Sequence, residues 1–296
     1  MPGADVFSSN KRKTLNETLG FRYDDSHNSR WWLKDKSVVP AVRSVLTAID
    51  ECDGPSTHPD CEILKQLPDR LILRVRPPDS APQSFVAKIS LLPHLRERLK
   101  YHIMKNDRFG FAEAANLIIA AQRGLTVPGV YGYGRIYGPF GLIRKSIVIL
   151  EDLAHHVTIG KLLDLNRQNQ SRCADMLGWT IPVFVGLYNA NCNHIDVNLN
   201  SIMFDSKDDN KRGFLLDFEY ARFYDKPSIE ILMFEAAHFA KCCPDRLKGD
   251  TINNWLAKLL DAVEIREALS REKAIDRFNC YYSSGRLSRK ERVRIH

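Results

Sequence analysis

Two aspartates, each next to an apolar segment, constrain the fold of this 296-residue chain most strongly. His194-Ile195-Asp196 follows an apolar, helix-like segment, and Leu215-Leu216-Asp217 ends a short apolar run, with Asp217 21 residues after Asp196. Burying a carboxylate at a strand end costs free energy unless it binds a cation or a hydrogen-bond donor. The pattern therefore predicts two loops on adjacent strands, each presenting an acidic group.

The hydrophobic pattern predicts strands in the first part of the chain and helices in the second. Residues 70–75 and 84–91 have the pattern of two strands, joined at the turn signal of residues 77–80 into a hairpin. The next expected element is a helix at 111–123 that ends at Gly124, with an apolar face formed by Phe111, Ala114, Ile118 and Ala121. The later elements are a buried strand at 146–150, a helix at 176–188 with Pro182 early in it, and strands at 202–204 and 213–216.

This order of elements predicts an α+β protein with two lobes. The polar, weakly patterned residues 1–30 are expected to be a flexible or loosely docked N-terminal arm. Residues 31–150 would form a small β-rich N-lobe that includes the 111–123 helix. Residues 151–296 would form a compact helical C-lobe that carries both acidic loops.

The charge of the chain is basic and unevenly distributed. The formal net charge is +7, and residues 271–296 carry eight Lys or Arg against three Asp or Glu. A second basic stretch contains Arg96, Arg98, Lys100, Lys105 and Arg108. Basic surfaces attract phosphorylated glycans, nucleic acids or anionic membranes. No nucleic-acid-binding motif accompanies these residues, so we do not expect a nucleic-acid partner.

Other features of the sequence favour a reducing, cytoplasmic location. No apolar run approaches the roughly 20 residues that span a bilayer, and the first 20 residues lack the profile of a signal peptide. The seven cysteines are an odd number without a CxxC spacing, which argues against a disulfide framework or a zinc site. The adjacent His155 and His156 are expected in a surface loop, without a metal.

Four residues occur in the order that a kinase requires. Lys88 lies in the second hairpin strand, where it would bind nucleotide phosphates, and Glu113 in the next helix would pair with it. Asp196 would accept the proton of the acceptor hydroxyl, and Asp217 would bind the Mg²⁺ that bridges the phosphates. The order predicts an ATP- and Mg²⁺-dependent phosphotransferase with a bilobal, protein-kinase-like fold.

The stretch from Ser84 to His296 resembles the lipopolysaccharide core kinases, the Kdo/WaaP family of the protein-kinase-like superfamily. The resemblance rests on Gly124-Leu125-Thr126-Val127-Pro128, on Leu142-Ile143-Arg144-Lys145-Ser146 leading to Leu150-Glu151-Asp152-Leu153, and on Arg286-Leu287-Ser288-Arg289-Lys290-Glu291-Arg292. It implies that Lys88 binds the nucleotide phosphates and that Glu113 positions Lys88. It also implies that the backbone of Glu151 and Leu153 hydrogen-bonds adenine. Asp196 would be the base and Asp217 the metal ligand.

Two features depart from the usual kinase pattern. Kinase catalytic loops place an asparagine five residues after the aspartate as a second metal ligand, and this chain has Ser201 there. Ser201 itself, Asn200 or Asn198 is the candidate replacement. No Gly-x-Gly-x-x-Gly loop precedes Lys88, so backbone amides of residues 66–70 would cover the phosphates. Both departures leave a weak enzyme or a pseudokinase as alternatives.

The segment after Asp217 bears on the phosphate acceptor. Only 79 residues follow, without an Ala-Pro-Glu element, which favours a glycan or small-molecule acceptor over a protein. We expect transfer to a sugar hydroxyl of a lipopolysaccharide-core-like or other lipid-linked glycan, by a cytoplasmic enzyme that attaches peripherally to the inner face of an anionic membrane. The alternatives are an aminoglycoside- or choline-kinase-like enzyme and a nucleotide-binding pseudokinase.

Overall fold

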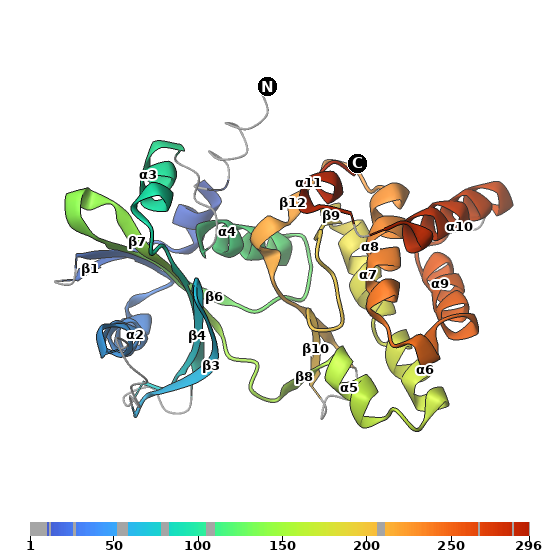
Figure 1. Cartoon of the computed structure of the whole chain (residues 1–296), viewed down its shortest axis with the longest axis horizontal. Helices are drawn as coiled ribbons and strands as arrows, with labels where there is room; N and C mark the ends of the chain where they lie inside the picture. Colours follow the sequence, from blue (N-terminus) through green and yellow to red (C-terminus); the bar gives the residue numbers. More distant parts are fainter. Residues whose placement is uncertain are drawn as a thin grey trace. The chain divides into compact units, whose positions relative to one another are not determined.

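The computed structural model describes residues 11, 13–25, 28–51, 59–77, 83–104, 110–205, 211–265, 267–285 and 287–295. The chain divides into two compact units, the first with residues 1–119 and 128–153 and the second with residues 120–127 and 154–296. The first unit is rich in strands and the second in helices, as the sequence pattern predicts (Figure 1). The boundary expected after residue 150 falls after Leu153.

A seven-stranded sheet, antiparallel throughout, forms the framework of the first unit. The strands lie in the order β1-β2-β6-β7-β5-β4-β3. Their bounds are β1 Phe21–Asp25, β2 Ser29–Leu33, β3 Cys61–Leu67, β4 Arg70–Val75, β5 Phe85–Leu91, β6 Val130–Tyr137 and β7 Ile143–Glu151. The expected hairpin is the antiparallel pair β4–β5, and its turn lies partly outside the described residues. The expected strand at 146–150 is the inner part of β7.

Several described residues of the stretch 1–30 are buried or belong to the sheet. Leu15 and Leu19 are buried, and β1 and the start of β2 belong to the sheet. Trp31 of β2 is fully buried opposite Gly134 of β6. A Cβ atom at Gly134 would lie 2.2 Å from the indole ring, so the ring occupies the space that a side chain would need. The polar composition of the stretch gives no indication of these few buried apolar residues. The N-lobe is larger than expected because the two strands extend its sheet.

The two faces of the sheet have different partners. Helix α2 (Val39–Glu51) packs on one face, in a core that includes Phe85, Ala87 and Ile89 of β5. Because strand side chains alternate between faces, Lys88 points to the opposite face. Helices α3 (Leu95–Met104) and α4 (Gly110–Gln122) lie on that side (Figure 1).

Helix α4 confirms the expected helix but not its single apolar face. Residues from Phe111 to Ala120 are almost all buried, including Glu113, whereas Ala121 is exposed. Gly124 ends the helix with φ of 84°, and the amides of Gly124 and Leu125 donate to the carbonyls of Ala121 and Ala120. This is the Schellman arrangement, which explains the glycine at this position.

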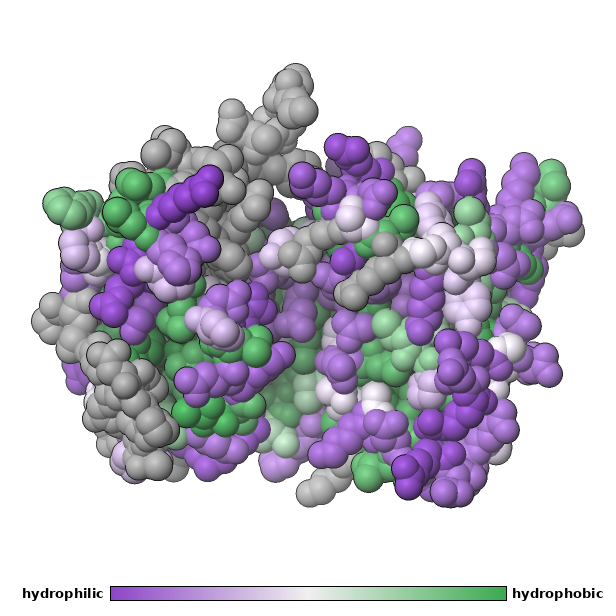
Figure 2. Space-filling view, viewed as in Figure 1, coloured by the Kyte–Doolittle hydropathy of each residue, from purple (hydrophilic) through white to green (hydrophobic). Residues whose placement is uncertain are grey.

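Strand β3 is the edge of the sheet next to β4. It exposes Ile63, Leu64 and Leu67, each by about 40%. Hydrophobic surface is visible over β3 and β4 in Figure 2. An exposed edge strand with apolar side chains offers both unpaired backbone groups and apolar contact area.

The second unit consists mainly of helices. They are α5 Ile159–Leu165, α6 Gln170–Gly178, α7 Ile181–Asn189, α8 Ile229–Cys242, α9 Asp250–Ala262, α10 Ala268–Ser283 and α11 Arg289–Arg292. Two small antiparallel sheets accompany them, built from β8 His156–Thr158, β10 Ile202–Asp205 and β11 Gly213–Leu215, and from β9 Cys192–Asn193 and β12 Arg222–Phe223. The described residues also include short 3₁₀ helices at Lys36–Val38, Pro139–Gly141, Phe218–Tyr220 and Asp245–Leu247.

The single helix expected at 176–188 is wrong, because the chain breaks between α6 and α7. Pro182 has no amide hydrogen to donate to the carbonyl of Gly178, and its ring clashes with that carbonyl. A proline is tolerated in the first turn, so a new helix begins at Ile181. At the break, the hydroxyl of Thr180 donates a hydrogen bond to Leu177 O at 2.7 Å and accepts one from Trp255 Nε1 at 3.1 Å.

Two further expectations concern histidines and membrane spans. His155 is exposed as expected, but His156 lies in β8, where its ring packs edge-on against Phe214, so the surface-loop assignment is wrong for His156. Among the residues that the structure describes, no helix has the length and apolar character required to cross a bilayer. The six cysteines in the described ranges are free thiols.

Candidate active site

Lys88 and Glu113 form a close ion pair in the first unit. Lys88 Nζ lies 2.6 Å from Glu113 Oε1, and the two side chains are 15% and 7% exposed. Regular structure places both groups: β5 directs Lys88 to the face where the first turn of α4 presents Glu113. The sequence predicted this pairing from the strand and helix positions.

The acidic side chains at the end of β7 accept hydrogen bonds from neighbouring residues of the first unit. Glu151 Oε2 accepts a hydrogen bond from Gly129 N at 2.9 Å. Asp152 Oδ2 accepts from Arg74 Nε at 2.8 Å and from Ser84 Oγ at 2.6 Å, and the Asp152 side chain is only 3% exposed. Because both carboxylates bind protein donors, recognition of a flat base by this segment would fall to its backbone groups.

The loop that carries Asp196 rests on a buried carboxyl group. Glu235 of α8 is buried, and its Oε1 accepts from Ile195 N at 2.6 Å. Burial raises the pKa of Glu235 to about 8. Ile195 has φ of 78°, an unfavourable conformation for a β-branched residue. Such backbone strain persists only where surrounding contacts hold it, and the Glu235 hydrogen bond is one of those contacts.

A second buried group, Arg292 of α11, reaches the same loop. Its Nη1 donates to Ile195 O at 2.9 Å and forms an ion pair with Asp196 Oδ1. The sequence pattern predicts no site role for Glu235, and Arg292 enters only as part of the basic ending that resembles the Kdo/WaaP family. A single acidic residue within the apolar run of α8 was the signal for Glu235, whereas the contact of Arg292 with a loop about 100 residues away leaves no local signal.

The histidine before Asp196 supports the loop. His194 Nε2 lies 2.6 Å from Leu216 O, and a carbonyl only accepts, so Nε2 carries the proton. Leu216 N donates to Ser201 O at 2.8 Å, which joins the two acidic loops through their backbones. Asp217 follows directly, with φ of 63° in the left-handed region.

The three candidates for the missing asparagine differ in what their side chains do. Ser201 is buried, and its Oγ accepts from Asn198 N at 2.8 Å and donates to Asn198 O at 2.9 Å. The Asn198 side chain donates to Asp196 O and accepts from Asn200 N, each at 2.8 Å. Ser201 and Asn198 therefore shape the loop through their side chains; Asn198 and Asn200 both line a cavity, and Ser201 is not among the residues that line it.

The two acidic loops carry oxygen donors of the kind that Mg²⁺ takes in proteins. Mg²⁺ in nucleotide sites takes one or two protein oxygen ligands together with phosphates and water. The carboxylate of Asp217 and the carboxamide oxygen of Asn200 are hard donors of this type, on loops whose backbones are hydrogen-bonded to each other. Within the described ranges, no group of three His, Cys, Asp or Glu side chains forms a metal site by itself.

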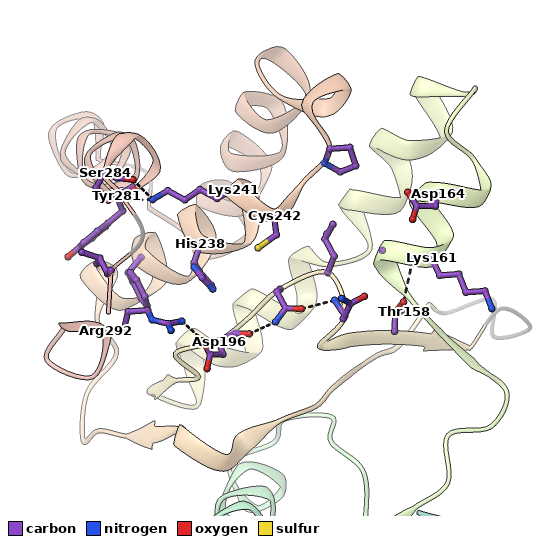
Figure 3. Close-up of a pocket in the computed structure, with 17 residues that line it drawn as sticks. Thr158, Lys161, Asp164, Asp196, His238, Lys241, Cys242, Tyr281, Ser284 and Arg292 are labelled. Carbon is purple, nitrogen blue, oxygen red and sulfur yellow. Dashed lines mark hydrogen bonds and ion pairs between the residues drawn. The ribbon is translucent and has the colours of Figure 1, made fainter. Parts of the chain in front are cut away.

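A cavity of about 890 Å³ lies within the second unit, and Asp196 is part of its wall. Its charged lining comprises Lys161, Lys241 and Arg292 against Asp164 and Asp196. Phe234 and Tyr281 add an aromatic wall, with their rings edge to face and centroids 5.5 Å apart. Figure 3 shows the ion pair of Arg292 with Asp196 and the contact of Lys241 with Ser284 at this cavity. Lys241 Nζ donates to Ser284 O at 2.7 Å, and burial lowers the pKa of this lysine.

A strand lysine paired to a helix glutamate, followed by two loop aspartates, is the residue order of the protein-kinase-like phosphotransferases. The family model described as "Lipopolysaccharide kinase (Kdo/WaaP) family" matches residues 88–228. This match confirms the resemblance to that family and identifies the chain as a kinase. No curated protein matches the chain.

The solved structure of WaaP in complex with acyl carrier protein is similar in fold. The TM-score is 0.51 at 14% sequence identity, and the alignment covers 84% of this chain and 99% of that one. The likeness confirms the expected α+β, kinase-like fold. Residues 1–87, which contain β1, β2 and α2, precede the segment that the family model matches.

Proposed function

We propose that the chain transfers the γ-phosphate of ATP to a sugar hydroxyl, on a lipopolysaccharide-core-like or other lipid-linked glycan. Lys88 binds the phosphates and Glu113 holds its ammonium group in place. The backbone of Glu151 and Leu153 binds adenine. Asp217, with Asn200, would hold the Mg²⁺ that neutralises phosphate charge, and Asp196 accepts the proton of the acceptor hydroxyl.

The observation that carries this proposal is the position of Asp196 on the cavity wall. A base must lie within hydrogen-bond reach of the hydroxyl that it deprotonates, and the cavity offers room for a sugar beside this carboxylate. Three cationic side chains against two carboxylates favour a neutral or anionic acceptor. This balance disfavours the aminoglycoside- or choline-kinase-like alternative, whose acceptors are cationic.

The direct test is phosphate transfer from labelled ATP with Mg²⁺ to a panel of acceptors: core glycolipid, aminoglycosides and generic protein. We expect label on the glycolipid, loss of transfer in Asp217→Ala, and intact ATP binding with greatly reduced transfer in Asp196→Asn. Asp164→Asn is the matched control, because Asp164 is an exposed carboxylate on the same cavity wall. Full activity of Asp196→Asn would refute the assigned base, and ATP binding without turnover would identify a pseudokinase.

The second metal ligand is tested in the same assay. Asn200→Ala should lower activity and raise the Mg²⁺ concentration required, because it removes an oxygen donor. Ser201→Ala should leave the Mg²⁺ requirement unchanged, since its hydroxyl binds the Asn198 backbone. The opposite pattern would assign the metal ligand to Ser201.

We also propose that the protein attaches peripherally to anionic membranes at their cytoplasmic face. The net charge of +7 supports this, but several basic groups are already engaged. Arg271 pairs with Asp261, Arg277 with Glu230 and Arg292 with Asp196, while Lys105 and Arg108 lie outside the described residues. Binding should be modest and weaken with salt, at about 1 kcal/mol for each remaining basic residue near the surface. Equal sedimentation with neutral and anionic vesicles at low salt would contradict it.

A further inference from the structure

The loop around Asp196 contains no cation of its own. Its sequence from His194 to Ser201 is His-Ile-Asp-Val-Asn-Leu-Asn-Ser, without lysine or arginine. A carboxylate on an irregular loop has rotational freedom unless a donor restrains it. Any cation that orients Asp196 must therefore come from another element of the fold.

Arg292 is the cation that the fold brings to this loop. Its side chain is 7% exposed, and one nitrogen, Nη1, contacts both the Ile195 carbonyl and the Asp196 carboxylate. Asp196 remains 29% exposed and borders the cavity. The guanidinium group thus holds one oxygen of the carboxylate from within the protein, while the residue still faces the space where an acceptor would bind (Figure 3).

The segment that carries Arg292 is itself fixed by hydrogen bonds. Ser288 N donates to Glu291 Oε2 at 2.7 Å, and Glu291 N donates to Ser288 Oγ at 3.4 Å, which is a capping box for α11. Asn193 Nδ2 donates to Arg292 O at 3.3 Å and to Ile295 O at 3.4 Å. Asn193 immediately precedes His194, so both ends of the contact belong to the same small region of the fold.

A second acidic group, Glu235, lies beside the same loop. Glu235 approaches the loop from α8, and Asp196 raises the pKa of Glu235 whereas Arg292 lowers it. Because burial raises the pKa of Glu235 to about 8, this carboxyl group is protonated at neutral pH, and the negative charge that Arg292 meets at the loop is that of Asp196. The guanidinium group also satisfies the carbonyl of Ile195.

We propose that Arg292 is a positioning residue, which orients the Asp196 carboxylate for proton transfer from the acceptor. The proposal rests on the phosphotransferase function proposed above. It predicts a defect in the chemical step and not in nucleotide binding, because Arg292 belongs to the second unit and contacts the proposed base.

The experiment compares kcat and KM for ATP in the full chain and in Arg292→Ala, Arg292→Gln and Lys290→Ala. We expect Arg292→Ala to lower kcat by about 100-fold, the scale of a misplaced catalytic group, with KM for ATP unchanged. Lys290→Ala is the matched control, because it removes an exposed cation from the same short helix. Millimolar guanidinium ion, far below denaturing concentrations, should restore part of kcat to Arg292→Ala and none to Asp196→Asn.

The outcomes separate this inference from the function on which it rests. A wild-type kcat in Arg292→Ala or Arg292→Gln, with Asp196→Asn inactive, would overturn the positioning role and leave the proposed function intact. An increased kcat would show that Arg292 restrains the base, which also overturns the role. Should Arg292→Ala fail to fold, Arg292→Gln carries the test, because it keeps a donor without the charge. No transfer by the wild-type chain would end both proposals.

Discussion

The two units hold their candidate catalytic groups in different ways. In the first unit, Lys88 and Glu113 belong to a strand and a helix, and the periodicity of those elements brings them together. In the second unit, Asp196 lies on an irregular loop with a strained Ile195, and the buried side chains of Glu235 and Arg292 hold that loop. Regular elements position a side chain by local geometry, whereas a loop needs polar partners that are distant in sequence.

The largest expected effect comes from breaking the Lys88–Glu113 pair in the first unit. Lys88→Ala removes the proposed phosphate-binding charge and should lower kcat/KM by at least about 100-fold. Glu113→Ala should cost less, about tenfold, because the lysine remains. The melting temperature should also fall in Lys88→Ala, because the buried Glu113 carboxylate loses its ion-pair partner. Steady-state kinetics with thermal unfolding checks this; a larger loss for Glu113→Ala than for Lys88→Ala would reverse the assigned roles.

The next largest effect concerns the stability that a buried polar contact gives to the first unit. Arg74 pairs with Asp152, whose side chain is 3% exposed, and with Glu62, whose side chain is 51% exposed. Asp152→Asn should lower the free energy of unfolding by about 2 kcal/mol, because it weakens a buried, charge-assisted network. Glu62→Gln, the matched control, should cost no more than about 0.5 kcal/mol, since exposed pairs contribute little. Equal losses in urea titrations would show that burial does not set the strength of these pairs.

The last effect is a pH dependence that belongs to the second unit. Burial raises the pKa of Glu235 from 4.5 to about 8, so the folded state binds a proton that the unfolded state releases over this range. The resulting stability is fully present below pH 4.5 and is lost as the pH rises towards about 8. Glu235→Gln removes this titration, so its free energy of unfolding should fall less over the same range, by a few kcal/mol, since each unit of pKa difference corresponds to about 1.4 kcal/mol.

Urea unfolding of both proteins across that range measures the difference between the two slopes. Glu267→Gln serves as the control, because Glu267 is exposed and its replacement should leave the pH dependence of the wild type in place. Parallel curves for Glu235→Gln and the wild type would show that Glu235 is already ionised in the folded protein.

The sequence predicted the parts of the fold that depend on local pattern. The β4–β5 hairpin, helix α4 with its glycine cap, and the β10–β11 pair follow from alternation, helical repeat and turn residues. The Lys88–Glu113 pair follows as well, because each residue has a fixed place on a regular element. The break before Pro182 also has a local cause, but the apolar run around it concealed the break.

The rest of the candidate site depends on contacts between distant segments. The contact of Arg292 with Ile195 spans 97 residues, and that of Glu235 with the same residue spans 40. The sheet role of residues 21–33 was missed for the same reason, since Trp31 becomes buried only through its pairing with β6. Composition alone described this stretch as polar, although its few apolar residues determine where it packs.

The absence of a side chain at Gly134 has a consequence for the evolution of such chains. The β1–β2 hairpin lies before the segment that matches the kinase family, whereas Gly134 lies inside that segment and provides the space for Trp31. The indole of Trp31 therefore requires a glycine at position 134, although the two positions are about 100 residues apart. In related sequences, a larger residue at this position should accompany either the loss of the hairpin or a small residue in place of Trp31.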